Sequence, residues 1–188
     1  MPAPNPSPAE RLAAIRERIE KARLRFGAPP ERVELVAVSK TFPPEAIRPL
    51  LEAGQRVFGE NRVQEARDKW PALRSEFADV QLHLIGPLQT NKVREAVRLF
   101  DVIETLDRDR LAAALAAEMA HQERRLPVFV QVNIGGEAQK SGIAVEEAVE
   151  FVDRCRRAHG LEVVGLMCIP PEGEPPGPYF ALLSQLAR

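Results

Sequence analysis

The sequence predicts an α/β fold built around a parallel sheet. Short runs rich in Val, Ile and Leu alternate six times with amphipathic stretches, and most of these runs lack the polar alternation of half-exposed strands. Such alternation is typical of right-handed β-α-β crossovers. Two architectures stay open, a doubly wound open sheet and a (β/α) barrel, because a full barrel typically needs about 250 residues and this chain has 188.

Composition restricts the classes of function. Lys plus Arg is 26 and Asp plus Glu is 27, so a net charge of -1 argues against binding nucleic acid or an anionic membrane through bulk charge. No apolar run approaches the roughly 18 residues of a membrane-spanning helix, and the start MPAPNPSPAE does not resemble a secretory signal. Cys155 and Cys168 have no metal-binding or CxxC spacing, so we expect reduced thiols in a cytoplasmic chain.

The first element is a predicted helix. Residues 1–8 are rich in proline and are expected to form a disordered tail, with a single domain over residues 9–188. Ser7, Pro8 and Glu10 match a helix start signal. Apolar residues then recur every three or four positions, and Gly27 with the following Pro29-Pro30 pair is expected to end the helix.

The six apolar runs are the predicted strands, and the stretches between them are predicted helices. The strands are expected at residues 35–38, 56–59, 82–85, 102–106, 128–132 and 163–169. The helices are expected at residues 44–53, 63–77, 93–100, 111–119, 145–152 and 179–188. Pro49 should kink the first of these helices or split off its first turn.

Polar residues follow the predicted strands, where parallel α/β folds place their ligand sites. These residues are Ser39-Lys40-Thr41, Glu60-Asn61, the segment 86–92, Asn133 with Lys140, and Met167 with Ile169-Pro170-Pro171. A set so rich in amides and glycine suits a small-molecule site.

Lys40 is the most informative of these positions. It ends a buried run, so its side chain is expected to point into the mouth of the sheet, where partial desolvation favours the neutral amine that can attack an aldehyde. The alternative is a lysine that only begins a loop. Lys140 could likewise place a second positive charge near a phosphate or carboxylate, or be solvated.

Three other positions also keep two interpretations. Asn61 could donate to an oxygen of a ligand, or it could cap the next helix. Glu60 could orient Asn61, or it could be solvated. His83 lies inside a strand, where a buried and hydrogen-bonded structural histidine is more common than a catalytic base.

The segments after the strands resemble the motifs of a known family. They are LVAVSKTFP, FGENRVQEA, HLIGPLQTNKV, QVNIGGEAQKSGI and GLMCIPP, in that order. They resemble the pyridoxal phosphate homeostasis proteins, also called the proline synthase co-transcribed family. No dinucleotide-binding, P-loop, zincin or serine-hydrolase motif competes with this resemblance.

The resemblance implies a (β/α) TIM-type barrel like the N-terminal domain of alanine racemase, here with about six of eight β/α units. It implies pyridoxal 5′-phosphate (PLP) bound as a Schiff base on Lys40, with Asn61, His83 and Met167 as further cofactor-binding residues. It also implies a cytosolic protein, a monomer in its complete form, without established catalysis. The family is thought to buffer PLP or deliver it, so the expected partners are PLP and PLP-dependent apo-enzymes.

The sequence departs from the family pattern in three places. Leu82 replaces a usual Trp, and Arg62 replaces a frequent Tyr. The family's Ser-Met-Gly-Met-Ser and Arg-x-Gly-x-x-x-Phe-Gly segments, which carry its last two strands and most of its phosphate-binding groups, are not among these residues. We therefore expect an incomplete domain at the C-terminal end, which leaves the strands near residues 35–38 and 163–169 as open, apolar edges. Weaker cofactor binding and a tendency to self-associate should follow.

Two other functions remain as alternatives. A PLP-dependent racemase needs acid and base groups on both faces of the cofactor. In alanine racemase one of them is a tyrosine from a separate β-domain, and Tyr179 is the single tyrosine here. His83 could stand in for it, but the sequence favours a binding protein. A Schiff-base aldolase would not need PLP.

Overall fold

The computed structural model describes residues 5–27 and 33–188. Residues 1–4 of the predicted tail and the Pro29-Pro30 pair lie outside this range. The described part contains a parallel sheet with the strand order β1-β2-β3-β4-β5-β6. The strands are β1 (Ala37–Val38), β2 (Val57–Glu60), β3 (Gln81–Leu84), β4 (Val102–Leu106), β5 (Val128–Gln131) and β6 (Val163–Met167).

The strand order decides between the two predicted architectures. Every strand pairs with the next strand along the chain, whereas a doubly wound sheet reverses its order at a switch point. The order is therefore that of a (β/α) barrel. The α/β prediction is confirmed, and most predicted strands lie within one or two residues of the observed ones.

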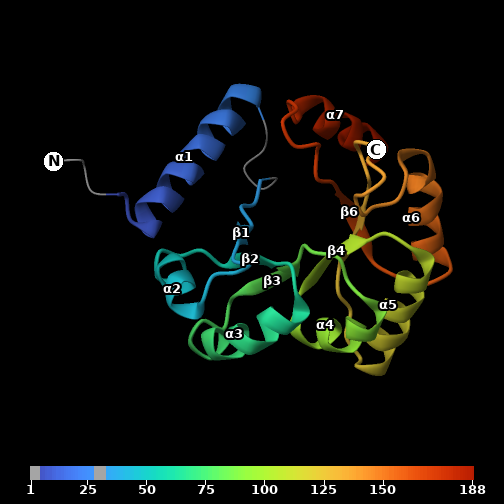
Figure 1. Cartoon of the computed structure of the whole chain (residues 1–188), viewed down its shortest axis with the longest axis horizontal. Helices are drawn as coiled ribbons and strands as arrows, with labels where there is room; N and C mark the ends of the chain where they lie inside the picture. Colours follow the sequence, from blue (N-terminus) through green and yellow to red (C-terminus); the bar gives the residue numbers. More distant parts are fainter. Residues whose placement is uncertain (1–4, 28–32) are drawn as a thin grey trace.

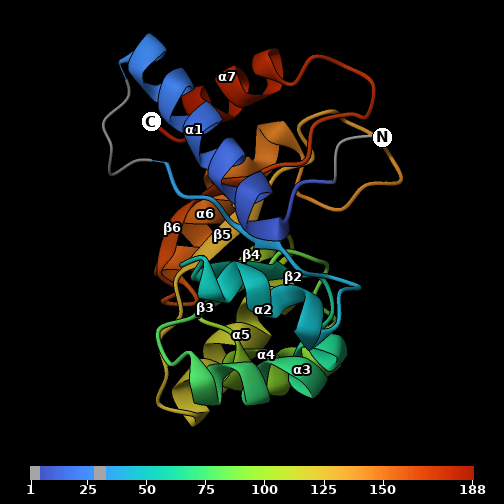
Figure 2. The same cartoon turned by 90° about the vertical axis from the view of Figure 1, so that its left-hand side faces the viewer.

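The helices cover the outer face of the curved sheet. They are α1 (Pro8–Phe26), α2 (Pro44–Glu52), α3 (Val63–Glu76), α4 (Val93–Leu99), α5 (Asp109–His121), α6 (Ala148–Arg157) and α7 (Gly177–Leu186). Figure 1 shows α2 to α6 in chain order around the sheet. Both views place α1 and α7 at the end of the molecule away from α3 and α4 (Figure 2). No helix of the described segments combines the length and apolarity needed to cross a membrane.

The predicted start of α1 is confirmed. The Ser7 side chain accepts from the Glu10 N–H at 3.2 Å, and the Glu10 carboxylate accepts from the Ser7 N–H at 2.7 Å. Gly27 follows the helix with a φ of 66°, a left-handed conformation that glycine adopts readily. Most of the apolar stripe stays at the surface, and Leu12 is the buried residue of this helix.

Pro49 does not split α2, which runs continuously from Pro44 to Glu52. Proline removes the N–H that would bond to the carbonyl of Glu45. Glu45 lies in the exposed first turn, where water can take the place of the missing donor.

The core lies between the sheet and its outer helices. Its largest fully buried side chain is Trp70 of α3, which packs against Phe58 of β2 with ring centroids 5.0 Å apart. Further core side chains come from β3, β4 and β5 and from the inner faces of α4 and α5. This packing fixes the carboxyl ends of the central strands relative to one another.

The two outermost strands are more exposed than the central ones. Within the described residues, β1 and β6 each have a strand neighbour on one side only. Val38 is 48% exposed and Val164 is 47% exposed. The general pattern of strands buried on both faces does not extend to β1 and β6, whose exposure matches the open, apolar edges expected at residues 35–38 and 163–169. β1 is shorter than the predicted 35–38 because its ladder reaches only β2.

Candidate functional site

A cavity of about 470 Å³ lies at the carboxyl edge of the sheet. Residues at or just after the ends of five of the strands line it, among them Lys40, Asn61, Gly86, Asn133 and Met167. Ligand sites of soluble proteins commonly measure about 300–1,000 Å³. Its size and position match the place where parallel α/β folds bind small molecules.

A second cavity, of about 550 Å³, lies at the opposite edge. It is lined by residues that precede β5 and β6, including Leu126 and Leu161, and by the end of α5. Because the amino-terminal face of a (β/α) barrel serves stability rather than ligand binding, the smaller cavity at the carboxyl edge is the candidate site.

The structure brings three of the four predicted cofactor-binding residues to this cavity. Lys40, Asn61 and Met167 line it together. His83 of β3 does not line it, but its Nδ1 lies 2.6 Å from Oε1 of Glu104, which does. The Nε2 of His83 is buried and has no partner within the described residues. His83 therefore lies behind the cavity wall and contacts a residue of that wall, Glu104.

Lys40 differs from the other lysines of the chain. All five lysines lie in the described ranges, and the other four each form an ion pair. Lys40 has no hydrogen-bond or ion-pair partner among the described residues. The predicted partial desolvation is wrong for this structure, because Lys40 follows an edge strand and is exposed. Its amine is free to bond to a ligand without breaking an existing contact.

Asn61 does not cap the following helix. The N-cap of α3 is Arg62, and it has no side-chain cap bond. The backbone of Asn61 instead touches the segment after β3, where a Cβ on Gly86 would lie 2.3 Å from the Asn61 carbonyl oxygen. Only glycine permits this contact, which sets the position of Asn61 on the cavity wall.

Lys140 brings a second positive charge to the cavity, but this charge is already paired. Its Nζ lies 2.6 Å from a carboxylate oxygen of Glu137 and donates to the Pro170 carbonyl at 3.3 Å. A phosphate that uses Lys140 would compete with Glu137 for it.

The cysteines are free, as the sequence predicts, and only Cys168 lines the cavity. Burial raises the pKa of the Cys168 thiol, and it raises the pKa of the more deeply placed Cys155 to about 11. At neutral pH both are neutral thiols, which are poor nucleophiles.

Sequence reasoning missed Glu104 and misjudged Glu60. Glu104 is a single carboxylate inside the apolar run 102–106, and a charge inside a buried strand signals a partner or a ligand. Glu60 is fully buried, so the solvated interpretation is wrong. Its carboxylate does not orient Asn61 but accepts from the Ser39 hydroxyl at 2.6 Å and pairs with Lys69 at 2.8 Å.

Comparison with known proteins places this architecture in a defined class. The family model described as "Alanine racemase, N-terminal domain" matches residues 11–188, so the fold is that of this barrel type. A pyridoxal phosphate homeostasis protein of Aquifex aeolicus is 39% identical over 94% of this chain and 78% of its own length. The one from Escherichia coli K12 is 42% identical over 88% of this chain and 72% of its own length. The chain belongs to the pyridoxal phosphate homeostasis protein family.

Solved structures agree with this assignment. PipY of Synechococcus elongatus, solved without PLP, is 36% identical with a TM-score of 0.79 over 95% of this chain and 78% of that chain. A second structure of PipY has PLP bound, with a TM-score of 0.76. Alanine racemase from E. faecalis is 16% identical with a TM-score of 0.65, a likeness of fold alone.

Proposed function

We propose that this chain binds PLP in the carboxyl-edge cavity, that Lys40 holds it covalently, and that the protein serves cofactor homeostasis without turning over amino acids. The observation that carries the proposal is the state of Lys40. It is the one lysine without a partner in the described parts of the chain, and it lines the same cavity as Asn61 and Met167. The family and the PLP-bound structure of PipY support the choice of ligand.

The residues of the cavity fit an anionic aldehyde of this size. PLP supplies an aldehyde that reacts with amines and a conjugated ring that absorbs visible light. The cations lining the cavity within the described residues are Lys40 and Lys140, and Glu104 is the single anion. The buried, unpartnered Nε2 of His83 behind Glu104 shows that this part of the wall holds unused hydrogen-bonding capacity.

The residues divide the work as follows. Lys40 would hold the ligand through its Nζ amine, and the ligand would supply the aldehyde group with which an amine condenses with loss of water. Asn61 and Met167 line the space beside it. Lys140 would place a positive charge near the phosphate of a bound ligand, and its ion pair with Glu137 balances that charge before the ligand binds.

A spectral titration tests the proposal. Adding PLP to the purified protein should give a visible band that saturates near equimolar ligand and persists after gel filtration. Borohydride should remove this band and leave the ligand covalently attached. A spectrum that is only the sum of free PLP and protein would overturn the proposal.

The second candidate is a PLP-dependent racemase, and the pairing of His83 with Glu104 beside the cavity favours it. It needs a further proton-transfer group on the opposite face of the ligand. The hydroxyl of Tyr179 donates instead to Glu174 at 2.5 Å, and Tyr179 is not among the residues that line the cavity. This arrangement favours binding without turnover.

We expect amino-acid turnover by the PLP-loaded protein to be negligible. The physical reason is that the described residues place one acid–base pair at the cavity, Glu104 on the wall with His83 behind it, rather than two groups on opposite faces. Deuterium exchange at the Cα of alanine and of several other amino acids is the measurement. Exchange at enzymatic rates, about 1 to 10³ per second, would support the racemase, and its dependence on His83 would show that His83 is the base.

We propose PLP-dependent apo-enzymes as recipients of the bound cofactor. The exposed position of Lys40 supports this, because an amine that is open to solvent can pass the ligand on without local unfolding.

A further inference from the structure

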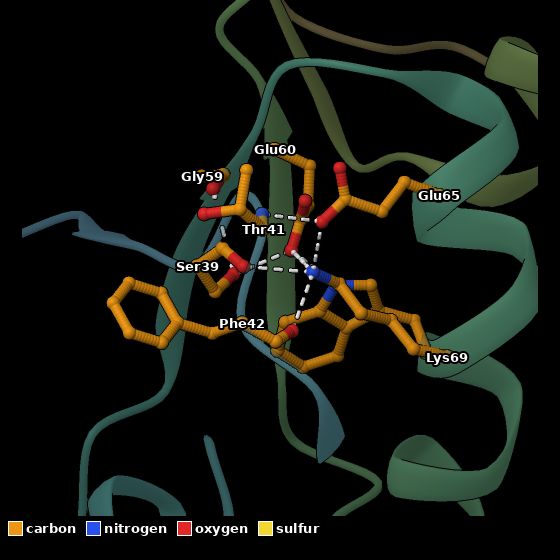
Figure 3. Close-up of polar contacts among 8 residues, drawn as sticks. Ser39, Thr41, Phe42, Gly59, Glu60, Glu65 and Lys69 are labelled. Carbon is orange, nitrogen blue, oxygen red and sulfur yellow. Dashed lines mark hydrogen bonds and ion pairs between the residues drawn. The ribbon is translucent and has the colours of Figure 1, made fainter. Parts of the chain in front are cut away.

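Lys69 is a buried lysine on α3 that binds the turn carrying Lys40. Its Nζ donates to the carbonyl oxygens of Ser39 at 2.7 Å and Phe42 at 3.1 Å, and it pairs with Glu60 and Glu65, each at 2.8 Å. The side chain of Lys69 is only 6% exposed. Figure 3 shows the ammonium group between the turn and the two carboxylates.

The turn itself is strained. The Phe42 N–H donates to the Ser39 carbonyl at 3.2 Å and closes a four-residue turn with Lys40 and Thr41 at its centre. Thr41 has a φ of 65°, a left-handed conformation that a β-branched residue rarely adopts. Such a conformation is unfavourable for a residue with a side chain and persists only where its surroundings hold it.

Helix α3 supplies the side chains that hold Thr41 in this conformation. The Thr41 N–H donates to Oε1 of Glu65 at 2.5 Å, the same oxygen that accepts from Lys69. Burial by itself raises the pKa of Glu65, but the hydrogen bonds from Lys69 and Thr41 and the charges of Lys69 and Arg62 outweigh burial and lower it. Glu65 is therefore ionised at neutral pH and can bind both the turn and Lys69.

The end of β2 completes the network. Glu60 is fully buried, and its Oε1 accepts from the Ser39 hydroxyl at 2.6 Å and from Trp70 Nε1 at 3.0 Å. A buried ammonium needs such a counter-charge to remain ionised. The network thus ties the turn to the second strand and to the core.

One residue of the turn takes no part in these hydrogen bonds. Ser39, Thr41 and Phe42 each bond to Glu60, Glu65 or Lys69, whereas Lys40 between them has no partner in the described structure. A network that served stability alone would have no reason to avoid the side chain at the centre of the turn. The contacts instead fix the backbone on both sides of Lys40 and leave its amine free.

We infer that Lys69 is a positioning residue, which acts through the turn at Ser39–Phe42 to present the amine of Lys40 to the cavity. Glu60 and Glu65 hold Lys69 in place. The inference rests on the proposed function, because the position of the Lys40 amine matters for binding only if Lys40 bonds to a ligand.

The test compares Lys69→Met with the double variant Lys69→Met/Glu60→Gln. The double variant also removes the buried negative charge that Lys69→Met leaves unpaired, while a glutamine oxygen can still accept from Ser39 and Trp70. Lys21→Met is the matched control. Lys21 and Glu17 form an ion pair with the same i,i+4 spacing as Lys69 and Glu65, but at an exposed site on α1, where the Lys21 Nζ lies 2.6 Å from the Glu17 carboxylate. Val97→Ala, a core change in α4, controls for a general loss of stability.

Two measurements are made on each variant. Hydrogen exchange reports the Thr41 and Phe42 amides, and borohydride trapping at set times reports the rate at which PLP attaches to Lys40. In the double variant we expect turn exchange at least about tenfold faster and attachment at least about tenfold slower, with α5 amides unchanged. Lys21→Met should match wild type in both, and Val97→Ala should lower the unfolding midpoint without changing the attachment rate.

The outcomes separate the inference from the proposed function. Attachment at the wild-type rate in the double variant would overturn the positioning role of Lys69. Attachment that falls equally in Val97→Ala would also overturn it, because stability alone would then explain the loss. Absence of attachment in the wild type would overturn the proposed function itself. If both Lys69 variants unfold, Glu65→Ala, which at a partly exposed site removes the acceptor of the Thr41 N–H and one of the two carboxylates paired with Lys69, must slow attachment for the inference to stand.

Discussion

Replacing Lys40 by alanine is expected to abolish the visible band that PLP gives with the wild-type protein. No other lysine both lines the cavity and is free of an ion pair within the described residues. Because the Lys40 side chain is exposed and unpartnered, the free energy of unfolding should change by less than about 0.5 kcal/mol. Spectral titration and denaturant unfolding measure the two effects on the same preparation.

The control for this loss is Lys21→Ala. Lys21 is exposed on α1 and paired with Glu17, away from the cavity, so this variant should keep the whole band. A Lys40→Ala protein with a band of wild-type amplitude would mean that another amine holds the cofactor.

Replacing Trp70 by alanine is expected to have the largest effect on stability. Trp70 is fully buried, packs against Phe58, and its Nε1 donates to Glu60 at 3.0 Å. Truncating a buried aromatic residue typically costs about 3–5 kcal/mol, and here the buried Glu60 carboxylate also loses a donor. Denaturant unfolding gives the difference in free energy.

Two further variants show how much of this loss of stability comes from the hydrogen bond and how much from burial of the ring. Trp70→Phe keeps most of the packing and removes the N–H, so it should cost about 1–3 kcal/mol. Phe26→Ala removes an aromatic ring that is 78% exposed on α1, and it should cost less than about 1 kcal/mol. A Trp70→Ala protein as stable as Phe26→Ala would show that the Trp70–Phe58 contact is not part of the core.

Much of the fold could be predicted from local sequence patterns. The apolar runs, the Ser7–Glu10 capping signal and the alternation of helix and strand depend on neighbours in sequence, and the structure confirms them. The exposure of β1 and β6 was expected only from the family segments that these residues do not include. It was not predictable from their own apolar runs, because it depends on which strands lie beside them in space. For the same reason the pattern could not separate a barrel from an open sheet, whereas the strand order does.

The site was predictable in part. Lys40 and Asn61 follow strands and Met167 ends one, so their meeting at one edge of the sheet follows from parallel topology. The ion pair of Lys69 with Glu60 was not predictable, because nothing in the spacing of a helix residue and a strand residue shows that they meet. The position of His83 behind Glu104 likewise depends on the register of β3 with β4, which the sequence does not encode locally.

Borohydride reduction of the PLP-loaded wild-type protein, followed by peptide mapping, tests directly whether Lys40 is the amine that holds PLP. The described lysines differ in burial and pairing, and only Lys40 combines a free amine with a place on the cavity wall. We expect the reduced label on the peptide that carries Lys40, at a stoichiometry that matches the lost absorbance. A label distributed over Lys69, Lys92 and Lys140 would contradict it, because the attachment would then be nonspecific modification.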